Sequence, residues 1–218
     1  MNLKLVFLII FAAVSVVHLV SLFFKQRLFQ AVTKGFLMPV LLAMYVFGAE
    51  KVFWPVVLAL VLGCAGDIFL VRINVLLFFR LGLASFLLGH IFYIIALFEF
   101  ARPFNITALL VSIAAAVVFE IVIFKVVHPN KEMKIPVIFY ETVIVAMAIF
   151  ALQVFLAQGG LSGISGTLVF AGSLCFLASD SILARFTFGS KPKYGDFLVM
   201  LTYLAAQFLI TLGFCALV

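Results

Sequence analysis

Two aspartates stand inside apolar runs of this sequence, where a charged side chain is costly and therefore needs a reason. Asp67 precedes Arg72 by five residues, and Asp180 precedes Arg185 by the same spacing. Five residues span about 7.5 Å of a helix, so each carboxyl group is expected below a basic helix end. Both should then lie at the same depth. We identify Asp67 and Asp180 as the candidate catalytic residues.

Buried carboxyl groups in a pair can act as general acid and general base. A low-dielectric environment favours the protonated form of one group, while a second that stays ionised can stabilise a cation or activate water. Glycosidases divide the work in this way around an oxocarbenium-like transition state. The alternative interpretation is structural, with each aspartate pairing with a nearby Lys or Arg to hold the helices together.

Seven further polar side chains in apolar helices are predicted to bind substrate or to support the aspartates. Two of the helices carry pairs on one face, His90 with Tyr93 and Tyr203 with Gln207. For His90 alone, a hydrogen-bonded core histidine is the simpler interpretation, and interhelical hydrogen bonding is an equal alternative for the second pair. The full set is Lys34, His90, Tyr93, Tyr140, Glu141, Tyr203 and Gln207.

The elements that must position these residues are membrane-spanning helices. The 218 residues are 67% hydrophobic and only 10% charged, with a mean hydropathy of +1.40, whereas a soluble domain is about a quarter charged. The apolar runs are continuous, which is typical of helices of about 20 residues and not of barrel strands. We predict an all-α membrane protein, a single domain over residues 1–218 with eight transmembrane helices. Their expected ranges are 3–23, 29–48, 54–71, 75–98, 104–124, 136–157, 164–184 and 196–217.

The basic residues predict the orientation of this bundle. Nine fall on the face opposite the N-terminus, and three fall on the N-terminal face. The positive-inside rule therefore places the face with nine basic residues in the cytoplasm and both termini outside. The candidate aspartates then lie toward the cytoplasmic leaflet. The net charge of +6 indicates a cytoplasmic rim and no nucleic-acid partner. The nine are Lys25, Arg27, Arg72, Lys125, Lys131, Lys134, Arg185, Lys191 and Lys193; the three are Lys4, Lys51 and Arg102.

An ordered set of short motifs runs through the chain. It consists of Thr33-Lys34 with Met38-Pro39, Gly66-Asp67 with Leu70, Phe86 with His90 and Tyr93, Ser179-Asp180, and Tyr203 with Gln207. Over roughly residues 30 to 213, this set resembles the YhhN-like lysoplasmalogenase family of small eight-helix membrane hydrolases. One departure is Gly35, where many members carry a proline after the lysine.

The resemblance implies hydrolysis of the vinyl ether bond of lysoplasmalogens to a fatty aldehyde and glycerophosphocholine or glycerophosphoethanolamine. The two aspartates of the family, which are thought to be catalytic, match Asp67 and Asp180. Lys34 would hold the lipid phosphate or keep one aspartate ionised, and the other polar residues would orient water or the headgroup. The expected partners are a lysophospholipid and membrane lipid, without cofactor or metal, and the expected location is a bacterial inner membrane.

Three other functions remain open from the residues alone. Buried acids with a lysine and a histidine would also suit a small proton-coupled transporter. A zinc-dependent, ceramidase-like hydrolase would need ligands from only three histidines, His18, His90 and His128, and no H-E-x-x-H pattern is present. The third alternative is a non-catalytic lipid-binding or assembly protein.

Overall fold

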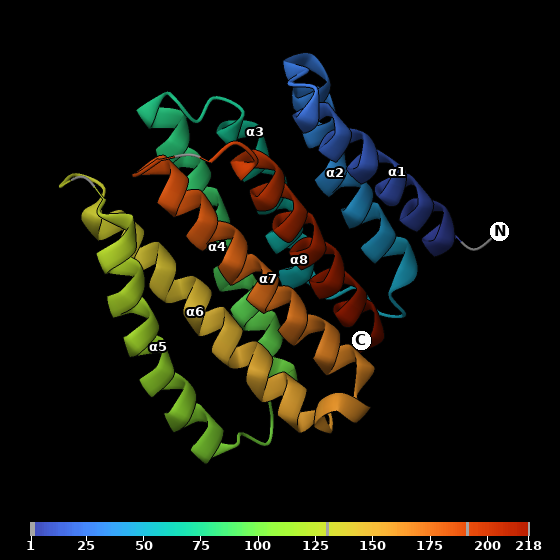
Figure 1. The fold of residues 1–218 in the computed structure, drawn as a ribbon. Coiled ribbons are helices and arrows are strands. Elements are labelled where there is room, and N and C mark those ends of the chain that lie inside the picture. The colour runs from blue at the N-terminus through green and yellow to red at the C-terminus, as the bar shows by residue number, and fades with distance from the viewer. Residues whose placement is uncertain (1–2, 130, 191, 218) are drawn as a thin grey trace. The chain divides into compact units, whose positions relative to one another are not determined.

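Helices make up almost all of the described chain. The computed structural model describes residues 3–129, 131–190 and 192–217, and no strand occurs within them. The eight predicted helices are confirmed, with bounds that differ by at most three residues. Lys191, counted above among the basic residues, lies outside the described residues. The helices are α1 (Leu3–Phe23), α2 (Arg27–Gly48), α3 (Trp54–Leu70), α4 (Leu76–Phe100), α5 (Ile106–Val127), α6 (Lys134–Ala157), α7 (Ile164–Thr187) and α8 (Gly195–Leu217), with a short 3₁₀ turn, η1 (Gly160–Ser162), before α7 (Figure 1).

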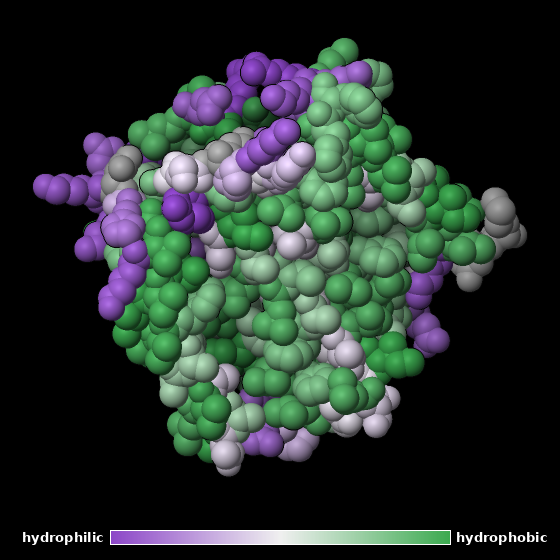
Figure 2. Space-filling view, viewed as in Figure 1, coloured by the Kyte–Doolittle hydropathy of each residue, from purple (hydrophilic) through white to green (hydrophobic). Residues whose placement is uncertain are grey.

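Seven of these helices are long and apolar enough to cross a membrane. The exception is α3, whose 17 residues rise about 25 Å, close to the lower limit for a span. The helix is extended by a turn in which the backbone NH groups of Val71 and Arg72 donate to carbonyls three residues earlier. Apolar residues cover most of the visible face in Figure 2, as expected for a surface that contacts lipid. The chain is therefore an integral, multi-pass membrane protein.

The described helices group into two compact units. The first contains the residues up to Ala96 together with those from Phe214, and the second runs from Leu97 to Gly213. In the first unit α1 packs on α2, and α2 packs on α3. In the second unit α6 packs on both α5 and α7. The prediction that residues 1–218 form a single domain stays a prediction.

Close helix contacts within each unit depend on small residues. In the first unit a Cβ atom added to Gly66 of α3 would lie 2.6 Å from the ring of Phe86 of α4. In the second unit a Cβ atom added to Gly172 of α7 would lie 2.9 Å from the carbonyl oxygen of Ala206 of α8. Missing side chains at these points let neighbouring helices approach, as is common in membrane bundles.

Gly66→Ala is expected to lower the free energy of unfolding by about 1–3 kcal/mol, because the buried Phe86 ring must move to admit the methyl group. Gly35→Ala is the matched control. Nothing lies within 4 Å of a Cβ atom built there, and alanine favours the helix more than glycine does. Unfolding in detergent should separate the two variants, and equal stabilities would contradict the close-contact explanation.

Candidate functional site

Asp67 is held in the first unit by a lysine from the neighbouring helix. The short 49–53 connection makes α2 and α3 an antiparallel pair, which brings Lys34 of α2 to Asp67 near the end of α3. The Lys34 Nζ atom lies 3.5 Å from Oδ1 of Asp67. The aspartate side chain is only 2% exposed and the lysine side chain 17%, so this ion pair is largely shielded from the surroundings.

His18 of α1 also belongs to this region, although from its sequence position it was expected only as a possible ligand in the zinc-hydrolase alternative. Its Nδ1 atom lies 2.7 Å from the hydroxyl oxygen of Thr33, the residue before Lys34, and the Thr33 hydroxyl donates to the carbonyl of Phe29. Both His18 and Thr33 are buried. The signal was present in the sequence, because an ionisable side chain inside an apolar helix is by default a candidate for function.

His90 and Tyr93 lie in the core of the first unit. Both side chains are buried, as their shared face on α4 predicts. The ring of Tyr93 stacks on Phe214 at a centroid distance of 6.1 Å. Their predicted contact with substrate stays a prediction.

Asp180 has partners of a different kind in the second unit. The hydroxyl group of Tyr140 in α6 donates a hydrogen bond to Oδ2 of Asp180 in α7. The preceding residue, Ser179, donates to the carbonyl of Val199 in α8 at 3.1 Å. The Ser179 contact links α7 to α8 and holds the backbone next to Asp180. The Tyr140 hydroxyl holds the carboxyl group of Asp180.

Glu141 adds a second carboxyl group to the surroundings of Asp180. It follows Tyr140 in α6, its side chain is buried, and it interacts electrostatically with Asp180. The structure thus brings three of the predicted residues together: a phenol and two carboxyl groups.

Tyr203 and Gln207 of α8 are both buried, which agrees with the predicted common face. The ring of Tyr203 meets Phe176 of α7 edge-on at 5.6 Å. Aromatic packing thus fixes the position of Tyr203 against α7.

The histidines of the zinc-hydrolase alternative lie in three helical segments, with His18 in α1, His90 in α4 and His128 capping the end of α5. Within the described ranges, no three His, Cys, Asp or Glu side chains are grouped as metal ligands.

The two aspartates therefore differ in the chemistry that surrounds them. The Asp67 carboxylate has an ammonium group beside it, and the Asp180 carboxyl group has a hydroxyl donor and another carboxyl group. A carboxylate held by a lysine suits stabilisation of a cation or activation of water, whereas two neighbouring carboxyl groups suit the storage and transfer of a proton.

Comparison with known protein families matches residues 29–214 to the YhhN family. Among curated proteins, the human lysoplasmalogenase TMEM86B is 34% identical over 132 residues. This alignment covers 61% of the chain and 52% of the relative, so the chain spans about half the length of that protein. No solved structure matches the chain.

Proposed function

Because the chain belongs to the YhhN family, we propose that it is a lysoplasmalogenase that hydrolyses the vinyl ether bond of lysoplasmalogens within the membrane. The observation that carries the proposal is a pair of buried aspartates, Asp67 and Asp180, in a multi-pass protein similar to a human lysoplasmalogenase. The products would be a fatty aldehyde and glycerophosphocholine or glycerophosphoethanolamine.

The proposed reaction begins with proton transfer to the β-carbon of the vinyl ether, which leaves an oxocarbenium ion. Water adds to the cationic carbon and gives up a proton to a carboxylate, and the resulting hemiacetal collapses to aldehyde and alcohol. Protonation of carbon is the difficult step, so a well-positioned acid and a fixed negative charge both lower the barrier.

We assign the proton donor to Asp180 and its neighbour Glu141, and the ionised carboxylate to Asp67. Glu141 interacts electrostatically with Asp180, so the two carboxyl groups are proposed to act as a coupled pair, and the Tyr140 hydroxyl orients the Asp180 carboxyl group. The Lys34 ammonium pairs with Asp67, which suits Asp67 to the role of the anion that stabilises the oxocarbenium ion. The remaining predicted residues would orient water or the headgroup, and they are His90, Tyr93, Tyr203 and Gln207.

We further propose that the reaction takes place toward the cytoplasmic leaflet of a bacterial inner membrane, since the basic residues favour that orientation. A lysolipid suits this setting, because its single chain can lie among helices while its headgroup stays near water.

Incubation of the purified protein with lysoplasmalogen and, in parallel, with lysophosphatidylcholine tests the activity. Aldehyde should appear from the first substrate. In heavy water the aldehyde should carry one deuterium on the carbon next to the carbonyl, as protonation of the β-carbon requires. Release of fatty acid alone would contradict the proposal. So would solute accumulation in proteoliposomes without hydrolysis, since it would indicate a transporter.

Tyr140→Phe should lower kcat about tenfold and leave KM unchanged, because the ring stays while the donor that orients Asp180 is lost. Tyr45→Phe is the matched control, since the Tyr45 hydroxyl is also buried and accepts a hydrogen bond from the backbone NH of Phe53 at 3.0 Å. Steady-state kinetics of both variants measure the difference. An unchanged kcat in Tyr140→Phe would remove Tyr140 from the mechanism.

A further inference from the structure

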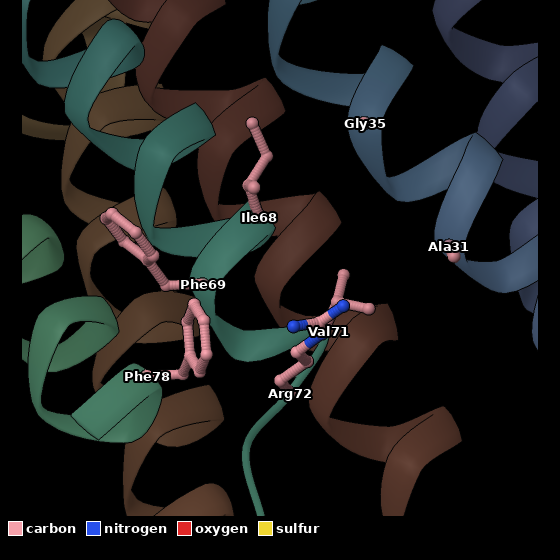
Figure 3. Close-up of a pocket in the computed structure, with 7 residues that line it drawn as sticks. All are labelled: Ala31, Gly35, Ile68, Phe69, Val71, Arg72 and Phe78. Carbon is pink, nitrogen blue, oxygen red and sulfur yellow. The ribbon is translucent and has the colours of Figure 1, made fainter. Parts of the chain in front are cut away.

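The first unit contains a hollow of about 360 Å³ that opens between α2, the end of α3 and the start of α4. Its apolar walls come from all three helices, and the single charged side chain on its lining is Arg72 (Figure 3). The lining residues are Ala31, Gly35, Ile68, Phe69, Val71, Arg72 and Phe78.

Two lining residues of this hollow follow the two partners of the ion pair in sequence. Gly35 follows Lys34 in α2, and Ile68 follows Asp67 in α3, and both line it. Ile68 and Arg72 are four residues apart, and the helical winding of α3 continues through the turn that contains Arg72. The residues that line the hollow therefore extend from the residue after Asp67 to the end of α3. Five residues of helical rise, about 7.5 Å, separate the levels of Asp67 and Arg72.

The guanidinium group of Arg72 belongs to an exposed residue that lines this hollow. It lies over the ring of Phe78 at 5.5 Å from the centroid, a cation–π contact that restricts where the group can point. Its planar set of donors is still suited to a phosphate, because guanidinium binds phosphate oxygens in a two-pronged geometry. The Lys34 ammonium already pairs with Asp67, so Arg72 is the cationic residue of the lining that would bind a phosphate.

Gly35 creates part of the space. Nothing lies within 4 Å of a Cβ atom built on it, although it sits inside a continuous helix. A side chain there would enter the hollow without displacing the protein's own atoms, so occupation by a ligand and by a larger residue should exclude each other.

We propose that this hollow, the headgroup pocket, binds the glycerophosphate part of a single-chain phospholipid, with Arg72 on the phosphate. The inference rests on the proposed function and deepens it. In a lysoplasmalogen the three-carbon glycerol unit separates the vinyl ether oxygen from the phosphate by a length comparable to the rise from Asp67 to Arg72. Phosphate bound at Arg72 therefore brings the vinyl ether to the level of Asp67, while the apolar walls contact the glycerol carbons.

Binding of a saturated ether analogue, 1-O-alkyl-glycerophosphocholine, tests the pocket without requiring turnover. Arg72→Gln should weaken binding of this analogue in detergent micelles about tenfold, the loss expected for a charge-assisted hydrogen bond. It should leave binding of 1-O-alkylglycerol, which lacks the phosphate, unchanged. The matched control is Arg102→Gln, since Arg102 also lies over an aromatic ring, that of Phe98 at 5.0 Å, but is not among the residues that line the hollow.

A blocking variant gives an independent measurement. Gly35→Phe should fill the headgroup pocket and weaken binding of the analogue at least about tenfold, while Val32→Phe, on an exposed part of the same helix outside the lining, should not. Both variants should elute from size-exclusion chromatography as the wild type does. If Gly35→Phe remains folded and binds normally, the pocket is not the binding site.

Three outcomes would overturn the inference, and they differ from failure of the proposed function. Unchanged binding in Arg72→Gln would remove the phosphate contact. Equal weakening for the phosphate-free alkylglycerol would show that Arg72 acts through the fold. Displacement of the analogue by inorganic phosphate as readily as by lysophosphatidylcholine would indicate a site for free anions. If instead the analogue binds in an Arg72-dependent way but lysoplasmalogen yields no aldehyde, the pocket stands and the assigned reaction is wrong.

Discussion

Asp67→Asn and Asp180→Asn are each expected to reduce aldehyde release from lysoplasmalogen by about a hundredfold or more, the usual contribution of a positioned acid or base. The substitution keeps the shape of the side chain and removes only its capacity to carry charge or donate a carboxyl proton. In the proposed mechanism, Asp67→Asn removes the anion that stabilises the oxocarbenium ion. In the same mechanism, Asp180→Asn removes a carboxyl group of the proposed proton donor.

The matched control for both is Asp196→Asn, an exposed aspartate in the first turn of α8, which should keep normal turnover. Kinetics in detergent, with size-exclusion chromatography as a check on folding, measure the effect. Near-normal turnover in either folded variant would rule out catalysis by two aspartates. Asp67→Asn should also change binding of the saturated analogue, since Asp67 directly precedes Ile68 in the lining of the headgroup pocket.

The helices of this protein could be predicted closely because each is a continuous apolar run ended by charged or turn residues. The largest differences between predicted and observed helix ends are three residues, at the ends of α5 and α7. There the helices continue past Phe124 and Ala184 into polar sequence. An apolar run shows where the hydrocarbon region must be crossed, but a helix can extend beyond it into the headgroup layer.

The two aspartates show what the sequence could not predict. Their matched spacing to Arg72 and Arg185 indicated equivalent positions, yet the partners found come from other helices. Lys34 is 33 residues from Asp67, and Tyr140 is 40 residues from Asp180. Such partners depend on which helix faces pack together, and apolar periodicity is too weak in nearly uniform hydrophobic helices to determine those faces.

The headgroup pocket could not be predicted from the sequence for a related reason. A hollow forms where neighbouring helices leave space between their side chains, so it depends on packing. In the sequence, Gly35 stood out only because many family members carry a proline at that position. The partner of His18, Thr33, could not be predicted either, because the two side chains meet only when α1 packs against α2.

Lys34→Met is expected to lower the free energy of unfolding by about 3 kcal/mol and to suppress turnover. The substitution keeps most of the side-chain volume but leaves the buried Asp67 carboxylate without its cation, and an unpaired buried charge is far more costly than a missing salt bridge. The matched control is Lys51→Met, because Lys51 is exposed in the 49–53 connection.

The double variant Lys34→Met/Asp67→Asn separates the structural part of this effect from the catalytic part. With both charges removed, the desolvation cost disappears, so most of the lost stability should return while turnover stays suppressed. Denaturant unfolding in mixed micelles and aldehyde release measure the two quantities on the same samples. If the double variant is as unstable as Lys34→Met, the lysine acts through packing of its carbon chain. If turnover returns with stability, the Asp67 carboxylate serves only to hold α2 against α3, and the assignment of the ionised carboxylate to Asp67 is wrong.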